Sequence, residues 1–141
     1  EAYGRAIIRL SATVYVVAAT AAFALSRRIA GLFVSDPAVV AVATGFVAAA
    51  AVSVVFLGVD GSATGTLRGA GDTRYPFVTS LVGRYGCALP VAALGLVTPL
   101  GSTALLGAFV VETAVPAGLN VARVRSNRWK AIGRAHVAAG D

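Results

Sequence analysis

Four long runs of apolar residues, separated by short polar segments, dominate the sequence of this 141-residue chain. The runs cover residues 10–26, 38–59, 76–97 and 103–122, and apolar residues extend the first run toward position 33. A helix that spans a bilayer needs roughly 20 mainly apolar residues. The runs are too long for ordinary strands, and they lack the alternation of polar and apolar positions that membrane barrels require. The pattern therefore predicts an all-α, polytopic transmembrane bundle with four spanning helices.

Short signals at the ends of the runs set the predicted limits of the helices. Asp36 precedes Pro37, a combination typical of a capped helix start, and Pro76 begins the third run in a similar way. Trp129 lies between two basic residues after the last run, as expected for an aromatic anchor at the membrane surface. The expected limits are 1–130 for the transmembrane segment, with spans over about 6–33, 37–67, 76–97 and 102–124, and 131–141 for a short cytoplasmic tail.

Basic residues are distributed unequally between the two predicted sides of the membrane. Because four crossings return the chain to its starting side, the N-terminus, the turn at residues 68–75 and the C-terminus lie together. The opposite side carries only Arg27 and Arg28. The positive-inside rule places the more basic side in the cytoplasm, so we expect both termini to be cytoplasmic at the plasma membrane. The basic residues of that side are Arg5, Arg9, Arg68, Arg74, Arg123, Arg125, Arg128, Lys130 and Arg134.

Composition excludes several classes of function. The chain is 57% hydrophobic and 13% charged, whereas about a quarter of the residues in soluble domains are charged. The net charge is +6, and the basic residues cluster at the ends of the runs without aromatic residues between them, which argues against a nucleic-acid partner. One histidine and one cysteine provide neither a metal site nor a catalytic triad, so we expect no enzyme and no cofactor. Because the sequence contains no methionine, we expect a fragment of a longer protein.

Three ionisable residues fall inside the predicted spans: Asp60, Arg84 and Glu112. A charge in the hydrocarbon costs about 2.5–3.5 kcal/mol, so such residues face partners or a water-filled cavity. Asp60 and Arg84 both lie roughly 12–14 Å from the turn that joins their helices, so we predict that they can pair if they face each other. The pair is either static, or Asp60 exchanges Arg84 for a proton or a cation. Glu112 lies alone near the bilayer centre, in either a structural or a proton-coupled role.

Small residues and prolines provide further candidate positions in the spans. Gly61 and Gly65, followed by Gly69, recur at every fourth residue and would form a helix face that another backbone can approach closely. The alternative is a flexible segment that bends during a conformational cycle. Pro90 and Pro116 each remove a backbone hydrogen bond inside a predicted span, which indicates a kink or a hinge.

The turn after the second run resembles a loop of the multidrug and toxic compound extrusion (MATE) transporters, in which a Leu-Arg-Gly-x-Gly-Asp-Thr run precedes a helix that begins with proline. Further similarities lie in residues 29–37, in the helix that carries Arg84 and Pro90, and in the basic C-terminal end with Trp129. The resemblance covers about residues 5–130, and it implies the last four of twelve helices, with the N-terminal helices missing. The residues that carry the loop motif are Arg68, Gly69, Gly71, Asp72 and Thr73.

The resemblance implies antiport, in which a small organic and often cationic substrate is exported in exchange for protons or sodium ions. Some members carry a cation-site carboxylate about three turns before the loop arginine, where this chain has Leu57. Asp60 lies one turn nearer the loop, so Asp60 and Glu112 are candidate ion-coupling residues, with Arg84 as a candidate ion-pair partner. One alternative is a lipid-linked saccharide flippase of the related superfamily, whose anionic cargo would suit an arginine-lined cavity. The other is a membrane scaffold subunit without transport.

Overall fold

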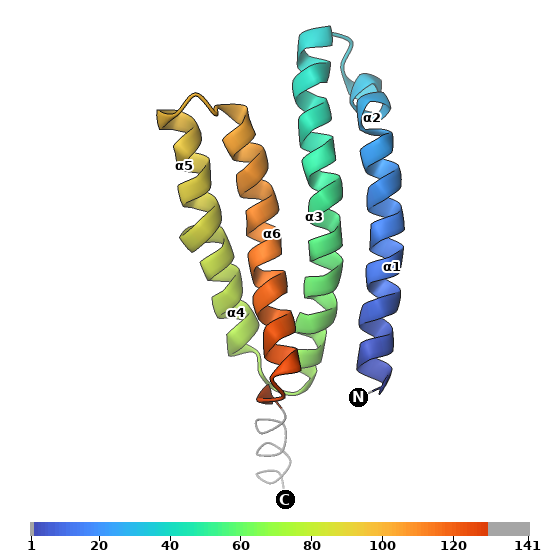
Figure 1. Cartoon of the computed structure of the whole chain (residues 1–141), viewed down its shortest axis with the longest axis vertical. Coiled ribbons are helices and arrows are strands. Elements are labelled where there is room, and N and C mark those ends of the chain that lie inside the picture. The colour runs from blue at the N-terminus through green and yellow to red at the C-terminus, as the bar shows by residue number, and fades with distance from the viewer. Residues whose placement is uncertain (1, 130–141) are drawn as a thin grey trace, which may run out of the picture.

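The computed structural model of this chain describes residues 2–129, and every regular element in that part is helical. Long helices run side by side in alternating directions (Figure 1). This arrangement confirms the predicted all-α class. The predicted tail at 131–141 lies outside the described residues, as do Lys130 and Arg134. The elements are α1 (Ala2–Ala24), α2 (Ser26–Phe33), α3 (Pro37–Gly69), α4 (Arg74–Leu81), the π-helix η1 (Val82–Ala88), α5 (Leu89–Val97) and α6 (Ser102–Arg125).

Three helical stretches in the described part are long and apolar enough to cross a membrane: Pro37–Gly69, Arg74–Val97 and Ser102–Arg125. A fourth crossing results if the bent pair Arg9–Ala24 and Ser26–Phe33 counts as one span. Only a small share of each of these stretches is buried against the rest of the chain. Because so many apolar side chains need an apolar environment, the chain is a multi-pass membrane protein whose surroundings include the lipid bilayer.

The first predicted span is bent by 63° between α1 and α2. Arg27 and Arg28 follow the bend directly, and both are exposed. Leu32 and Phe33, at the other end of α2, are also largely exposed. A short helix with basic and apolar positions suits the membrane surface, where charges reach water and apolar side chains reach lipid. The structure thus turns the end of this helix aside at the point where the sequence places two charges.

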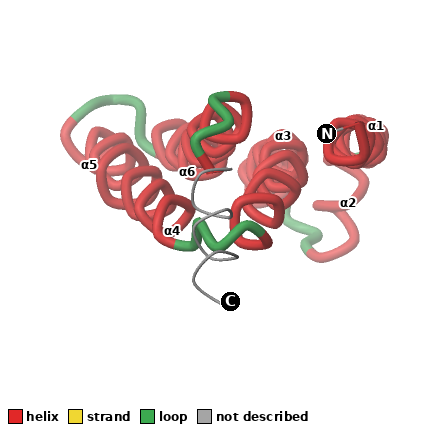
Figure 2. The backbone as a smooth tube through the Cα atoms, turned by 90° about the horizontal axis from the view of Figure 1, so that it is seen from below, coloured by secondary structure: helices red, strands yellow, loops and turns green. Residues whose placement is uncertain are grey.

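Helices α3 and α6 form the centre of the structure. Helices α1 and α2 pack against α3, while α4, η1 and α5 pack against α6. Viewed along the helices, the four passes form a curved row rather than a closed bundle (Figure 2). Several of the most deeply buried residues lie on these two central helices: Ser53, Ala63, Leu67, Ala117 and Asn120. Small side chains dominate this set, which allows the two backbones to approach closely.

The glycines that permit close packing differ from those that the sequence pattern indicated. A Cβ at Gly58 would overlap the ring of Tyr15, and one at Gly83 would lie 2.6 Å from Pro116 Cγ. In the described part of the chain, a Cβ at Gly61, Gly65 or Gly69 would meet no atom within 4 Å. Within the described part of the chain this stripe therefore contacts no other helix, and its role in packing or bending stays a prediction. The reason is that α1 and α6 contact other faces of α3.

The ends of α3 follow the sequence signals closely. The side chain of Asp36 accepts a hydrogen bond from the backbone N–H of Ala38 at 2.8 Å, which confirms the predicted helix start. At the other end, Gly71 adopts a left-handed conformation with φ of 84°. Its N–H donates to the carbonyl of Arg68, and the N–H of Asp72 donates to that of Leu67. These two bonds form a Schellman cap, which reverses the chain and places Asp72 beneath α6.

Candidate functional site

Arg84 and Glu112 form an ion pair between η1 and α6. The Nε of Arg84 lies 2.7 Å from Oε1 of Glu112, and the side chains are 66% and 31% exposed within this chain. Both residues belong to stretches that can cross a membrane. An exposed guanidinium facing hydrocarbon would be costly, so this side of the structure suits a water-filled cavity or further protein. The structure therefore pairs two of the three ionisable residues predicted inside the spans.

A proline on each helix shapes the surroundings of this pair. Pro90 lacks an N–H, and its ring crowds the carbonyl four residues earlier, so a regular α-helix is disfavoured there. The chain forms the wider π-helix instead, in which the N–H of Leu89 donates to the carbonyl of Arg84. On α6, Pro116 leaves the carbonyl of Glu112 without its usual helical donor and packs against Gly83. Each member of the charged pair therefore lies within two turns of a proline on its own helical segment.

The predicted pairing of Asp60 with Arg84 is wrong. Arg84 contacts Glu112, and Asp60 instead accepts a hydrogen bond from Nδ2 of Asn120 at 2.7 Å. The matching depths of Asp60 and Arg84 did not reveal that α6 lies between their helices (Figure 2). For the same reason Glu112 is not the lone carboxylate that the sequence indicated, because the intervening helix supplies a separate partner to each charge.

Asn120 is the centre of a buried polar cluster that the sequence analysis missed. Its Nδ2 also lies 3.2 Å from Oγ1 of Thr64, and its Oδ1 accepts a hydrogen bond from Oγ1 of Thr79 at 3.0 Å. The cluster joins α3, α4 and α6, and Asn120 is fully buried. Polar side chains that bond across helices are a recognised means of helix association in membranes. The available signal was the presence of an amide within an apolar run.

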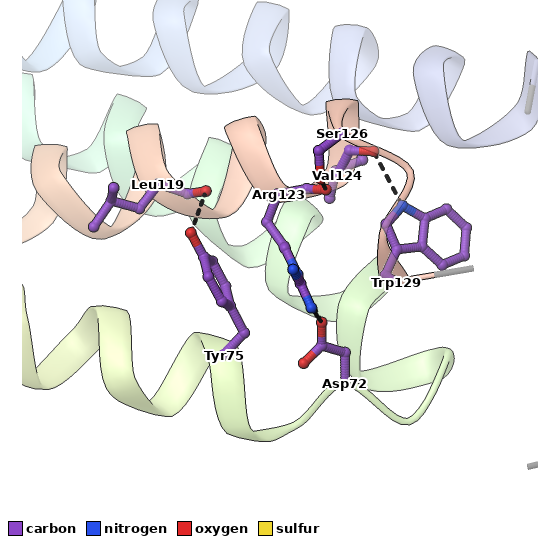
Figure 3. A network of polar contacts seen from close by, with 7 residues as sticks. All are labelled: Asp72, Tyr75, Leu119, Arg123, Val124, Ser126 and Trp129. Atoms are coloured by element: carbon purple, nitrogen blue, oxygen red, sulfur yellow. Dashed lines mark hydrogen bonds and ion pairs between the residues drawn. The ribbon is translucent and has the colours of Figure 1, made fainter. Parts of the chain in front are cut away.

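The loop motif is fastened to the end of α6 by a second ion pair (Figure 3). Nε and Nη2 of Arg123 each lie 3.0 Å from Oδ2 of Asp72, whose side chain is 5% exposed. The guanidinium also lies over the ring of Tyr75, 4.9 Å from its centroid, in a cation–π contact. Of the other motif residues, Arg68 and Thr73 are exposed. This part of the motif therefore has a visible structural role, which is to hold the α3–α4 turn against α6.

We expect a coupling energy of about 2 kcal/mol between Asp72 and Arg123, because hydrogen bonds to charged groups contribute about 1.5–3 kcal/mol. The measurement is a double-mutant cycle of Asp72→Ala and Arg123→Ala, followed by unfolding in detergent micelles. Each single change should cost nearly as much as the double change, since either one breaks the contact. Additive effects of the two changes would show that the pair contributes nothing to stability.

A groove of about 490 Å³ opens beside Arg84 and Glu112. It is bounded by α3, by η1 and α5, and by α6. Aromatic side chains from each of these three elements line it, namely Phe46, Tyr85 and Phe109. The only ionisable groups of its lining, apart from the Tyr85 phenol, are the paired guanidinium and carboxylate. The described residues thus combine a charged pair and an aromatic surface in one concavity.

Comparison with known proteins places these features in a family context. A family model described as MatE matches residues 1–94. The chain is 38% identical over 118 residues to a protein named probable multidrug resistance protein NorM from Deinococcus radiodurans. That match covers 80% of this chain and 25% of the relative, so the chain spans about a quarter of the relative's length. No solved structure gives a significant match.

Proposed function

This chain belongs to the MatE family of multidrug and toxic compound extrusion proteins, and on that premise we propose that it forms part of a secondary transporter that exports small organic compounds. The name of the relative supports multidrug resistance as the biological context. We propose further that eight N-terminal helices complete the transporter, in keeping with the relative's greater length. The basic end of the helices would face the cytoplasm at the plasma membrane.

The observation that supports this proposal best is the Arg84–Glu112 pair inside membrane-crossing helices. A protein that only anchors or scaffolds has no need for a charged pair at this depth, whereas transport pathways use such groups. The exchange for protons or sodium ions would act through the same carboxylate. A proton or cation on Glu112 weakens its hold on Arg84, and it shifts the inward and outward states only if its affinity for them differs.

Asp60 is the second candidate for ion coupling. Its carboxylate accepts a hydrogen bond from Asn120, which in turn contacts Thr79 on α4. Binding of an ion at Asp60 would therefore alter the hydrogen bonds that join α3, α4 and α6. The flippase alternative rested on Arg84 as a positive wall for anionic cargo, and the pairing of Arg84 with Glu112 neutralises that charge. The geometry thus favours a cargo other than a polyanionic lipid-linked saccharide.

The test is export of a fluorescent organic cation from vesicles that contain the full-length transporter. Proton and sodium gradients are imposed separately, on the wild type and on Glu112→Gln and Asp60→Asn. We expect gradient-driven export in the wild type, and a fall to background in at least one variant, because the neutral side chain cannot exchange an ion. Asp36→Asn serves as the control, since Asp36 is an exposed helix cap outside the groove.

Two results would contradict the proposal in different ways. If the wild type shows no gradient-dependent export, this cargo or the transporter assignment is wrong. If both variants export at the wild-type rate, the exporter remains and Glu112 and Asp60 have structural roles. The gradient that drives export, proton or sodium, identifies the coupling ion.

A further inference from the structure

We propose that the groove beside Arg84 and Glu112 binds a zwitterionic aromatic compound, with the charged groups of the ligand between the two side chains. The residues that would bind this ligand belong to this chain, while its role as exported cargo rests on the proposed function. Three features of the groove carry the inference: its size, its aromatic lining and the incomplete pairing of its two charges.

The size and polarity of the groove suit a small amphipathic molecule. Its volume of about 490 Å³ falls in the range of pockets that hold small ligands. The charged pair lies at one end, and Leu105 and Ala92 lie at the other. Arg84 and Ala92 are eight residues apart, which corresponds to roughly 12 Å along a helix. A ligand with a polar end and a ring system of two fused rings matches this length.

The aromatic lining provides surfaces on which a ring can stack. Phe46 and Phe109 are each 42% exposed and Tyr85 is 61% exposed, so part of each ring stays accessible after the packing of this chain. They come from three different elements and line the same groove. Aromatic pairs contribute stabilisation beyond the burial of their area. A ligand without a ring would forgo this contribution.

The charges of the groove select for a ligand that carries both signs. Arg84 and Glu112 share one contact, through Nε and Oε1. In the described part of the chain, no hydrogen bond reaches the two terminal nitrogens of Arg84 or Oε2 of Glu112. A ligand carboxylate can accept hydrogen bonds from the terminal nitrogens of Arg84, and a ligand ammonium can donate one to Oε2 of Glu112. The positions left open on the pair are thus complementary to a zwitterion.

A ligand with a single charge is at a disadvantage in this position. A monocation that draws Glu112 away leaves Arg84 without a partner, and a monoanion on Arg84 leaves Glu112 without one. An unpaired charge inside a membrane protein is costly. A zwitterion leaves all four charges paired. This asymmetry predicts a rank order of affinities that depends on charge type, with the same aromatic body throughout.

The experiment uses the full-length transporter in nanodiscs and three indole probes: tryptophan, tryptamine and indole-3-propionate. These carry both charges, the positive charge alone and the negative charge alone. By equilibrium dialysis, tryptophan should bind about tenfold or more tightly than either of the others, since a charge-assisted hydrogen bond has that effect on affinity. Equal affinities of the three probes would overturn the proposal.

Variants distinguish recognition of charge from a structural effect. Arg84→Gln should make tryptamine the best of the three probes, and Glu112→Gln should do the same for indole-3-propionate. Phe109→Ala should weaken all three. The matched controls are Arg28→Gln and Phe23→Ala, because both residues are exposed outside this groove. An unchanged rank order in both charge variants would contradict the proposal.

Two safeguards separate the possible failures. If the single variants do not fold, the exchanged pair Arg84→Glu with Glu112→Arg keeps both charges and should retain the preference for tryptophan. Loss of that preference in a folded exchanged protein would also overturn the proposal. Dye export without selective tryptophan binding leaves the proposed function intact and rejects this ligand class. Selective binding without gradient-driven export of the dye supports the site and counts against either this dye as cargo or the transport function.

Discussion

Replacing Asn120 with leucine is expected to lower the free energy of unfolding by about 3 kcal/mol, because the change leaves a partly buried carboxylate without its hydrogen-bond donor. Asn120 is fully buried and donates to Asp60 at 2.7 Å. It also accepts from Thr79. Leucine has the same branched shape and the same number of side-chain heavy atoms, but it cannot donate to the carboxylate of Asp60. The hydroxyl of Thr79 keeps its hydrogen bond to the carbonyl of Pro76. The expected loss is therefore that of the hydrogen bond to Asp60.

The measurement is the unfolding of purified protein in mixed micelles. Asp60→Leu combined with Asn120→Leu serves as the internal control, since replacing both members of a buried polar pair is often close to neutral. We expect the double variant to be more stable than Asn120→Leu alone. A single variant within about 1 kcal/mol of the wild type would contradict the prediction, because net hydrogen bonds of ordinary strength contribute about that much.

Replacing Gly83 with valine is expected to cost about 3 kcal/mol, at the upper end of the range for overpacking. A Cβ at this position would lie 2.6 Å from Cγ and 2.7 Å from Cδ of Pro116. It would also lie 3.1 Å from the carbonyl oxygen of Glu112. A proline ring and a helix backbone have little freedom to move aside. The two helices would have to separate, and the neighbouring Arg84–Glu112 contact would be disturbed as well.

Gly118→Val is the matched control, because Gly118 lies on α6 only two residues after Pro116 and a Cβ there meets nothing within 4 Å. Its thermal midpoint in detergent should stay close to that of the wild type. The midpoint of Gly83→Val should fall clearly, and the variant should elute abnormally on size exclusion if the helices separate. Equal shifts of the thermal midpoint in the two variants would show that the loss of stability reflects the helix propensity of valine rather than the contact with Pro116.

The position of each residue along its helix could be predicted from the sequence, but its direction around the helix could not. The lengths of the apolar runs, the Asp36 cap and the turn with Gly71 depend on neighbouring residues, so local patterns suffice. In soluble proteins the polar face of a helix shows which side is buried. These helices are apolar nearly all round, so that signal is missing. The pattern therefore indicated Gly61 on α3 as a packing position, whereas a glycine that does lie in close contact with another helix is Gly83 on η1.

The candidate site shows the same division. Asp60, Arg84 and Glu112 were found because each is a charge in an apolar run. Their partners were assigned from depth alone, and the actual pairing depends on α6 lying between α3 and the α4–α5 pass. Asn120 carries no charge, and its importance appears only when its three contacts are seen together.

The contacts of α6 also bear on cooperativity between the two candidate ion-coupling carboxylates. Two of the polar contacts between the α4–η1 segment and α6 are those of Thr79 with Asn120 and of Arg84 with Glu112. Asn120 also holds Asp60. A shift of α6 along its axis would alter both polar contacts in one movement, because they lie on the same helix. Occupancy at one carboxylate would then change the affinity of the other, and thermodynamic linkage requires the effect to be equal in both directions.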